Sequence, residues 1–153
     1  MIREKEKIKT VLVLLCFTTI VFGQTQTKVD TVACYLDKKI IIEYPARSRV
    51  NIVNYEEGFF KTISCILDTA AITIHCGKMV NLPLTDLKDK TICSEFRLGK
   101  DIRIIRGYSV VKGRKKYFRE DNYYRYGFTV VYENVDEAKL IYYEHFFNNM
   151  KIK

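Results

Sequence analysis

The sequence has no tryptophan, only two prolines and only two histidines among its 153 residues. It also lacks the short motifs for phosphate binding, nucleophilic catalysis or zinc hydrolysis: a P-loop, G-x-S-x-G, H-E-x-x-H, C-x-x-C and a glycine-rich dinucleotide turn are all absent. These absences exclude the common signatures of nucleotide-binding proteins and zinc proteases, and we expect neither a cofactor nor a bound metal. A binding domain without catalytic activity is therefore the leading hypothesis.

The two histidines, His75 and His145, are the remaining candidates for acid–base chemistry. Two histidines with a lysine can cleave RNA, so a small secreted hydrolase acting on an anionic polymer is the alternative hypothesis. No feature of the sequence brings the two residues together. His75 also directly precedes Cys76, and neighbouring residues on a strand point to opposite faces, which disfavours a shared zinc ion or a nucleophile–base pair.

The N-terminus has the three-part layout of a secretory signal peptide. Four basic residues among the first nine precede an apolar run over Val11–Phe22, which at about 12 residues is shorter than the roughly 20 that span a bilayer. Val21 and Gly23 suit the two positions before a cleavage site. We therefore expect residues 1–23 to be removed, leaving residues 24–153 as a periplasmic or secreted domain with no transmembrane segment. An uncleaved anchor is the alternative.

The exported part has the size of one domain, about 130 residues. No repeat, low-complexity tract or linker rich in proline, glycine and serine divides it. Its composition, rich in lysine, isoleucine, asparagine and tyrosine, is typical of a bacterial periplasmic or secreted protein.

Cysteine usage agrees with export. One of the five cysteines, Cys16, lies in the predicted signal peptide. The remaining four form an even set in a chain expected to reach an oxidising compartment, which predicts two disulfides. Four cysteines allow three pairings, and the spacing does not choose among them. The alternative is that some are buried free thiols. The disulfide candidates are Cys34, Cys65, Cys76 and Cys93.

The clearest strand is Tyr123–Glu133, in which aromatic and apolar residues occupy every second position. This alternation predicts one face on a core and one wetter face. A helix is predicted directly after it, over Asn134–Met150, with Asn134 as N-cap and a broad apolar stripe that packs on the sheet.

Short apolar runs separated by turn residues precede this strand. Turns are predicted at Asp37-Lys38, at Lys112-Gly113-Arg114 and at Asp121-Asn122, and one helical turn over Thr85–Lys90. About eight short strands at this spacing predict an α+β fold, in which a mostly antiparallel, curved sheet of short strands is covered by one C-terminal helix.

Positive charge is concentrated in one part of the chain. The formal net charge is +8. The segment Phe96–Tyr126 holds ten basic and three acidic residues, and the rest of the expected mature chain is almost neutral. The densest point, Lys112–Lys116, falls at a predicted hairpin tip beside several aromatic residues.

A basic loop with neighbouring aromatic rings can bind an anionic ligand or an acidic protein partner. We therefore predict a binding surface within residues 97–125. An inhibitor or immunity protein for another exported protein would show a protruding loop of this kind. The alternative is a solvated hairpin whose charges keep a sheet edge from pairing. The candidate binding residues are Lys112, Arg114, Lys115, Lys116, Arg119, Tyr117 and Tyr123.

Overall fold

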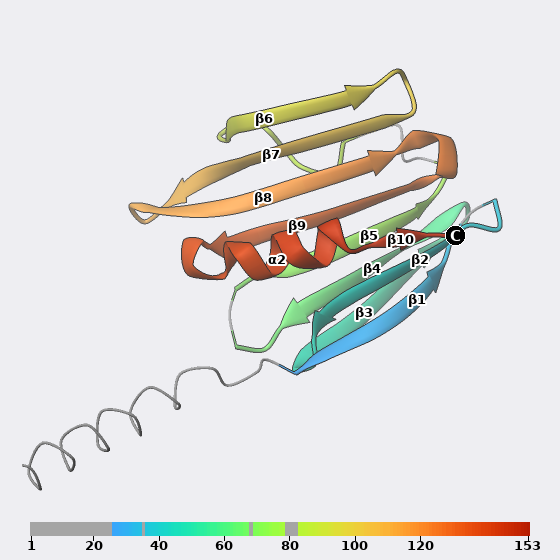
Figure 1. Ribbon diagram of the computed structural model, residues 1–153, viewed down its shortest axis with the longest axis horizontal. Helices are drawn as coiled ribbons and strands as arrows, with labels where there is room; N and C mark the ends of the chain where they lie inside the picture. The colour runs from blue at the N-terminus through green and yellow to red at the C-terminus, as the bar shows by residue number, and fades with distance from the viewer. Residues whose placement is uncertain (1–25, 35, 68, 79–82) are drawn as a thin grey trace, which may run out of the picture.

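The structure, a computed structural model, describes residues 26–34, 36–67, 69–78 and 83–153. The predicted signal peptide, residues 1–23, lies outside these residues. One layer is a twisted seven-stranded sheet, and the other combines a three-stranded sheet with a helix (Figure 1). The predicted α+β class, with mostly antiparallel strands and a C-terminal helix, is confirmed.

The larger sheet consists of antiparallel strands β3 (Ser48–Tyr55), β4 (Gly58–Cys65), β5 (Ala71–Gly77), β6 (Thr91–Leu98), β7 (Ile102–Val111), β8 (Arg114–Tyr123) and β9 (Phe128–Asp136). Their spatial order is β3-β4-β5-β9-β8-β7-β6. Most neighbours are consecutive in the chain, and the long-range pairing of β5 with β9 joins the two halves. The two outer strands are β3 and β6.

The second layer covers part of one face of this sheet, which we call the front face; the opposite face is the back face. Its strands are β1 (Thr27–Ala33), β2 (Lys39–Pro45) and β10 (Lys151–Ile152), in the order β1-β2-β10. Helix α2 (Leu140–Asn148) follows the short 3-10 helix η2 (Glu137–Lys139) and contacts β2 and β9. Figure 1 shows α2 running along β9 in front of the sheet, whereas no described element lies in front of β6 and β7.

The core lies between the two layers. Ile72 and Ile74 of β5 pair with Tyr132 and Val130 of β9, and all four are buried. Burying a large apolar side chain contributes roughly 1.5–3 kcal/mol, so these contacts hold the layers together. The buried residues that face them from the second layer include Ile40, Ile42, Tyr143, Phe146 and Phe147.

A disulfide between Cys34 and Cys76 links the end of β1 to β5 across the layers. The tertiary structure thus selects one of the three pairings that the sequence left open. Cys65 is half-buried and Cys93 is exposed, and both are free thiols. One disulfide is therefore present among the described residues, where the sequence predicted two.

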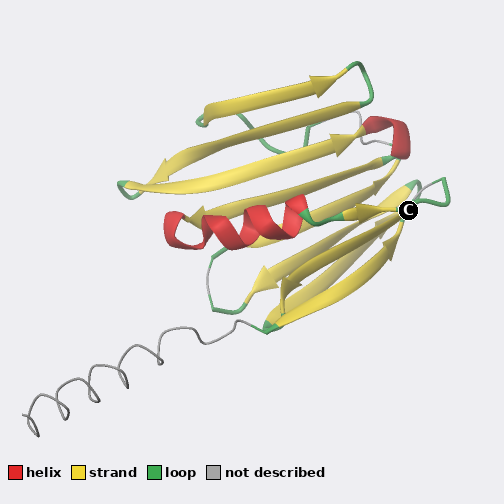
Figure 2. Ribbon diagram, in the orientation of Figure 1, coloured by secondary structure: helices red, strands yellow, loops and turns green. Residues whose placement is uncertain are grey.

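The predicted strand over Tyr123–Glu133 is wrong in its first half. Strand β8 continues to Tyr123, and the 3-10 helix η1 (Tyr124–Tyr126) with Gly127, at φ 67°, turns the chain into β9. Figure 2 shows this corner as a short helical segment between two strands. Thr129 was predicted to lie on the more solvated face of this strand. This prediction is also wrong, because Thr129 is fully buried. β9 lies in the middle of the sheet and is covered on both faces.

The predicted helix start at Asn134 is wrong as well. β9 continues to Asp136, because Lys116 of β8 still pairs with that residue. Asn134 lies within the strand at φ 59°, and α2 begins six residues later, at Leu140. Strand pairing therefore overrides the helical pattern of this segment.

Two predicted local features also differ from the structure. Asp121 and Asn122, predicted as a turn, are fully buried inside β8. The segment Thr85–Lys90 forms bends and turns instead of a helical turn. Within it, the Asp86 carboxylate accepts a hydrogen bond from the Lys88 N–H at 3.0 Å, which stabilises a turn.

Candidate functional site

The candidate site is built on the hairpin of β7 and β8. Lys112 and Gly113 form its two-residue turn, with φ values of 49° and 75°. Left-handed conformations at both positions match the twist of antiparallel strands, which makes this a favoured hairpin turn. The predicted turn at this position is confirmed.

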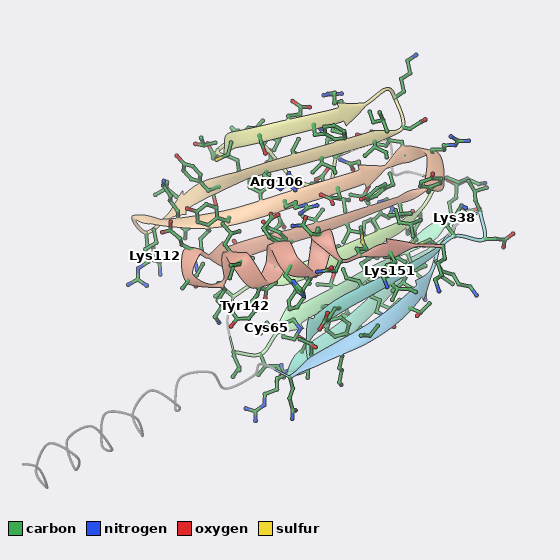
Figure 3. The ribbon with its side chains drawn as sticks, in the orientation of Figure 1. Lys38, Cys65, Arg106, Lys112, Tyr142 and Lys151 are labelled. Carbon is green, nitrogen blue, oxygen red and sulfur yellow. A yellow bond between two sulfur atoms is a disulfide. The ribbon has the colours of Figure 1, made fainter. Side chains whose placement is uncertain are left out.

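The end of this hairpin projects beyond its neighbours. Pairing between β6 and β7 ends at Thr91 and Tyr108, and pairing between β8 and β9 ends at Lys116 and Asp136. Residues 109–115 therefore pair only within the hairpin, and we call them the basic tip. Figure 1 shows the tip extending past the end of the sheet, and Figure 3 places Lys112 at its extremity.

Five of the ten basic residues in Phe96–Tyr126 form ion pairs within the fold. Glu95 binds two of them, Glu144 binds two and Asp136 binds one. These paired residues are Arg97, Arg103, Arg106, Arg119 and Lys116. Within residues 83–153, which are all described, the five that form no ion pair are Lys100, Lys112, Arg114, Lys115 and Arg125.

Three of these five unpaired cations lie on the basic tip. Lys112, Arg114 and Lys115 are exposed, and the Lys115 ammonium lies 4.5 Å from the centre of the Tyr108 ring. Two exposed valines, Val110 and Val111, accompany them. The tip therefore presents positive charge and apolar surface together.

The side chains at the base of the tip are held in contacts within the fold. Lys116 donates to Asp136 at 2.8 Å, and this hydrogen bond lowers the pKa of the Asp136 carboxyl. Tyr117 donates to the Glu137 carboxylate at 3.3 Å. Lys116 and Tyr117 are thus engaged in contacts of the fold, although both were candidate binding residues.

An open hollow of about 650 Å³ lies beside the tip and mixes both signs of charge. It is lined by Gly113, Arg114, Lys115, Asp136, Glu137 and Ala138. A ligand seated there would meet two cations on one side and two carboxylates on the other. Such a lining suits a partner that itself carries both kinds of charge.

Arg119 and Tyr123 do not lie on this surface. Arg119 is only 4% exposed and donates to Asp121, Glu144 and Asn148, which anchors α2 on the sheet. Tyr123 is half-buried, with its ring centre 4.8 Å from that of Phe128, and burial raises its pKa to about 12. Both residues point to the front face. The period of two along β8 indicates that they share a face with Tyr117, but only the tertiary structure shows that this face is covered.

A second buried polar cluster, on the back face, was missed by the sequence analysis. The Glu120 carboxylate accepts hydrogen bonds from the Thr85 N–H and from the Asn122 amide, both at 2.7 Å. Asn122 in turn accepts from the Thr129 hydroxyl at 2.8 Å. These bonds attach the segment around Thr85 to the sheet, so the cluster has a structural role.

The two histidines lie apart. His75 is buried on the back face of β5, with Nε2 2.7 Å from the Tyr55 hydroxyl and its ring stacked on Phe60. Burial lowers the pKa of His75. His145 is exposed on α2, which covers the front face. Because the sheet separates them, they do not form the acid–base pair that the hydrolase hypothesis requires.

Within the described ranges, no group of three or more His, Cys, Asp or Glu side chains is placed to hold a metal ion. In the same residues, no helix has the length and apolarity needed to cross a membrane.

Comparison with known proteins gives no match. No protein-family model, no curated protein and no solved structure is similar to this chain.

Proposed function

We propose that this protein is an exported, non-enzymatic binding domain whose basic tip docks into an acidic groove of another protein. The observation that supports this proposal is the position of three unpaired cations, Lys112, Arg114 and Lys115, on a hairpin that projects beyond both neighbouring strands. A projecting loop is also the feature expected of an inhibitor or immunity protein. Export is supported by the disulfide between Cys34 and Cys76, because disulfides persist in oxidising compartments.

The alternative role for these charges, protection of a sheet edge, fits the structure less well. β7 and β8 both lie inside the seven-stranded sheet, whose edges are β3 and β6. On the tip, only residues 109–111 of β7 and 114–115 of β8 lack a neighbouring strand outside the hairpin. Each of these runs is shorter than a typical strand of about five residues. Positive charge on the tip therefore needs another explanation, and contact with an acidic surface supplies one.

The distribution of the remaining charges favours a protein partner over a nucleic acid or other long polyanion. Lys100 and Arg125 lie at the opposite end of β7 and β8 from the tip, so the unpaired cations form no continuous track along the sheet. Proteins that follow a nucleic-acid backbone need such a track. The hollow beside the tip also contains Asp136 and Glu137, which would repel a uniform polyanion.

A capture experiment tests this proposal. A photo-reactive residue at Val111, on the tip, is used to cross-link partners in the compartment where the protein accumulates, and the same residue at Val29 on β1 is the positional control. We expect an acidic protein to be captured from Val111 only. Binding of that protein should weaken by about tenfold or more in a Lys112→Ser, Arg114→Ser, Lys115→Ser variant, and should fall with rising salt.

A matched variant, Lys100→Ser with Arg125→Ser, removes unpaired cations from the other end of the sheet and should bind as the wild type does. Both variants should keep the wild-type unfolding free energy, because all five residues are exposed. Equal binding by the tip variant and the wild type would refute the proposal. A different result would be retention of the wild type on heparin or single-stranded DNA, with retention lost in the tip variant and no protein captured. This result would indicate that the partner is a polyanion and not a protein.

A further inference from the structure

The edge strand β6 is an exposed pairing surface. All eight of its residues are exposed, and Phe96 and Leu98 are exposed by 54% and 59%. β6 pairs with β7 on one side only, so the peptide groups on its other side have no strand partner in the described chain. A long, apolar edge of this kind is a template for another strand.

The charges on β6 are complementary to each other. Glu95 and Arg97 lie two residues apart and therefore point to the same face of the sheet, the back face. Edge strands commonly prevent pairing through charged side chains, above all lysine, through prolines or through bulges. One acid and one base on the same face do the opposite, because an antiparallel second copy can place each opposite its counterpart.

The regular part of β6 determines where such a pairing would be centred. A register shift lies between Ile92 and Ser94, so the undisturbed run is Ser94–Leu98. Its middle residue is Phe96. An antiparallel pairing that uses the whole run therefore places Phe96 opposite Phe96 of the second copy.

We propose that two copies of this chain associate through β6, antiparallel and with two-fold symmetry, to form one continuous sheet. Phe96 lies on the symmetry axis and contacts its counterpart on the front face. On the back face Glu95 lies opposite Arg97 of the second copy, and the symmetry repeats this pair. Leu98 lies opposite Ser94 and diagonal to Phe96 of the second copy, within reach of its ring on the front face. Such an interface is isologous and closes at two copies.

Neighbouring registers are disfavoured by the same charges. Moving the axis by one residue, to Glu95 or to Arg97, places two like charges directly opposite each other, which is destabilising. Arg103 of β7 also contacts Glu95 at 2.8 Å and holds this carboxylate in position while Arg97 reaches the second copy. The side chain of Arg97 is the more exposed of the two arginines that contact Glu95, and so it is available for this contact.

The other edge of the sheet offers no equivalent complementarity. β3 is exposed at Val50, Ile52 and Val53, but Arg49 is its only charged residue. Pairing of β3 with a second copy would therefore form no opposite-charge pair. Of the two edges of the larger sheet, this difference favours β6. On β1, an edge of the smaller sheet, Lys28 and Asp30 also lie two residues apart, but Asp30 is already bound to Lys61 of β4.

Sedimentation equilibrium of the purified protein tests the proposal through charge reversal. We expect a wild-type dimer, and dissociation constants about tenfold or more higher for Glu95→Arg and for Arg97→Glu, because each change places like charges opposite each other twice. The double variant, which exchanges the two charges, should associate to within about threefold of the wild type. Arg49→Glu on β3 is the matched control and should not alter association.

Cross-linking tests the register independently. In a background with Cys65→Ser and Cys93→Ser, Phe96→Cys should form an intermolecular disulfide under mild oxidation, because directly opposite residues lie about 5 Å apart. Leu98→Cys in the same background should not, since its neighbour across the interface is Ser94. A monomer at all concentrations, a dimer insensitive to both single charge reversals, or cross-linking through residue 98 instead of residue 96 would overturn the proposal.

This inference is independent of the basic tip. The variant with Lys112, Arg114 and Lys115 replaced by serine should form the same dimer as the wild type, because these residues lie outside Ser94–Leu98. Failure of partner capture and failure of dimerisation are therefore separate results.

Discussion

Arg119 Nη1 donates to Glu144 Oε2 at 2.7 Å, and this contact joins the interior of β8 to α2. The same guanidinium donates through Nε and Nη2 to the two oxygens of Asp121, at 2.7 and 2.8 Å. Glu144 also accepts from the Tyr132 hydroxyl at 2.6 Å, and burial together with this carboxylate raises the pKa of Tyr132. A charged network, in addition to apolar packing, therefore fixes the helix on the sheet.

Replacing Arg119 should destabilise the protein strongly. Arg119→Met leaves the fully buried Asp121 carboxylate without its cation, and breaking a buried pair in this way costs about 3–5 kcal/mol. Urea unfolding followed by circular dichroism measures the loss. Arg114→Met, on the exposed tip, is the control and should change the unfolding free energy by less than about 0.5 kcal/mol. Similar stabilities for the two variants would contradict this account of the network.

Breaking the disulfide should destabilise the protein by about 4 kcal/mol, because the bond closes a loop between residues 42 apart and so restricts the unfolded chain. The change is the double variant Cys34→Ser, Cys76→Ser. Replacing Cys65 and Cys93 by serine is the control and should have a much smaller effect. Alkylation followed by mass spectrometry checks the pairing: without reductant, Cys65 and Cys93 should be labelled and the other two protected. Labelling of all four would show that the bond is not formed.

Stability should fall on mild acidification because of His75. Its folded-state pKa lies below the ordinary value of 6.5, so the unfolded chain binds a proton first as the pH falls. The contribution of neutral His75 is fully present above that ordinary value and is lost as the pH falls through the lowered folded-state pKa. Unfolding free energies measured from about pH 7.5 to about pH 5.5 should show this decline.

The histidine substitutions isolate the cause of this decline. His75→Asn should flatten the dependence of the unfolding free energy on pH in this interval, whereas His145→Asn, on the exposed side of α2, should retain the wild-type slope. A decline that persists unchanged in His75→Asn would assign the effect to other groups.

Replacing Gly107 or Gly99 by alanine should lower the stability of the protein by different amounts. A Cβ at Gly107 would clash with the Thr91 carbonyl oxygen and lie 2.8 Å from Cε1 of Phe118, so Gly107→Ala must separate β7 from its neighbours. We expect a loss of about 3 kcal/mol, at the upper end for overpacking. Gly99 has open space around it and φ +56°, so Gly99→Ala should cost only about 1 kcal/mol through backbone conformation. Thermal unfolding compares the two, and equal losses would contradict the crowding at Gly107.

The hairpin of the basic tip could be predicted because its signals are local. The glycine in Lys112-Gly113 permits the left-handed turn, and apolar residues on both sides supply the strands. The same local reasoning failed at Asp121-Asn122. These polar residues resemble a turn, yet they lie inside β8. Asp121 accepts from Arg119 two residues away on the same strand, and Asn122 accepts from Thr129 of the adjacent strand β9.

The start of the final helix shows the same limit. Asn134 is a good N-cap in isolation, but β8 extends the strand past it by pairing Lys116 with Asp136. A pairing between residues 20 apart in the chain outweighs the local preference of a single residue.

The sequence by itself determined the α+β class, most of the strands and turns, and the concentration of positive charge between residues 97 and 125, because these follow from composition and from periods of two and 3.6 residues. Only the tertiary structure decided which cysteines pair, that Arg119 lies in the interior, and that Lys112, Arg114 and Lys115 remain unpaired on a projecting tip. These outcomes depend on which strands become neighbours and which layer covers them. Such contacts join residues distant in the chain, and local sequence preferences do not encode them.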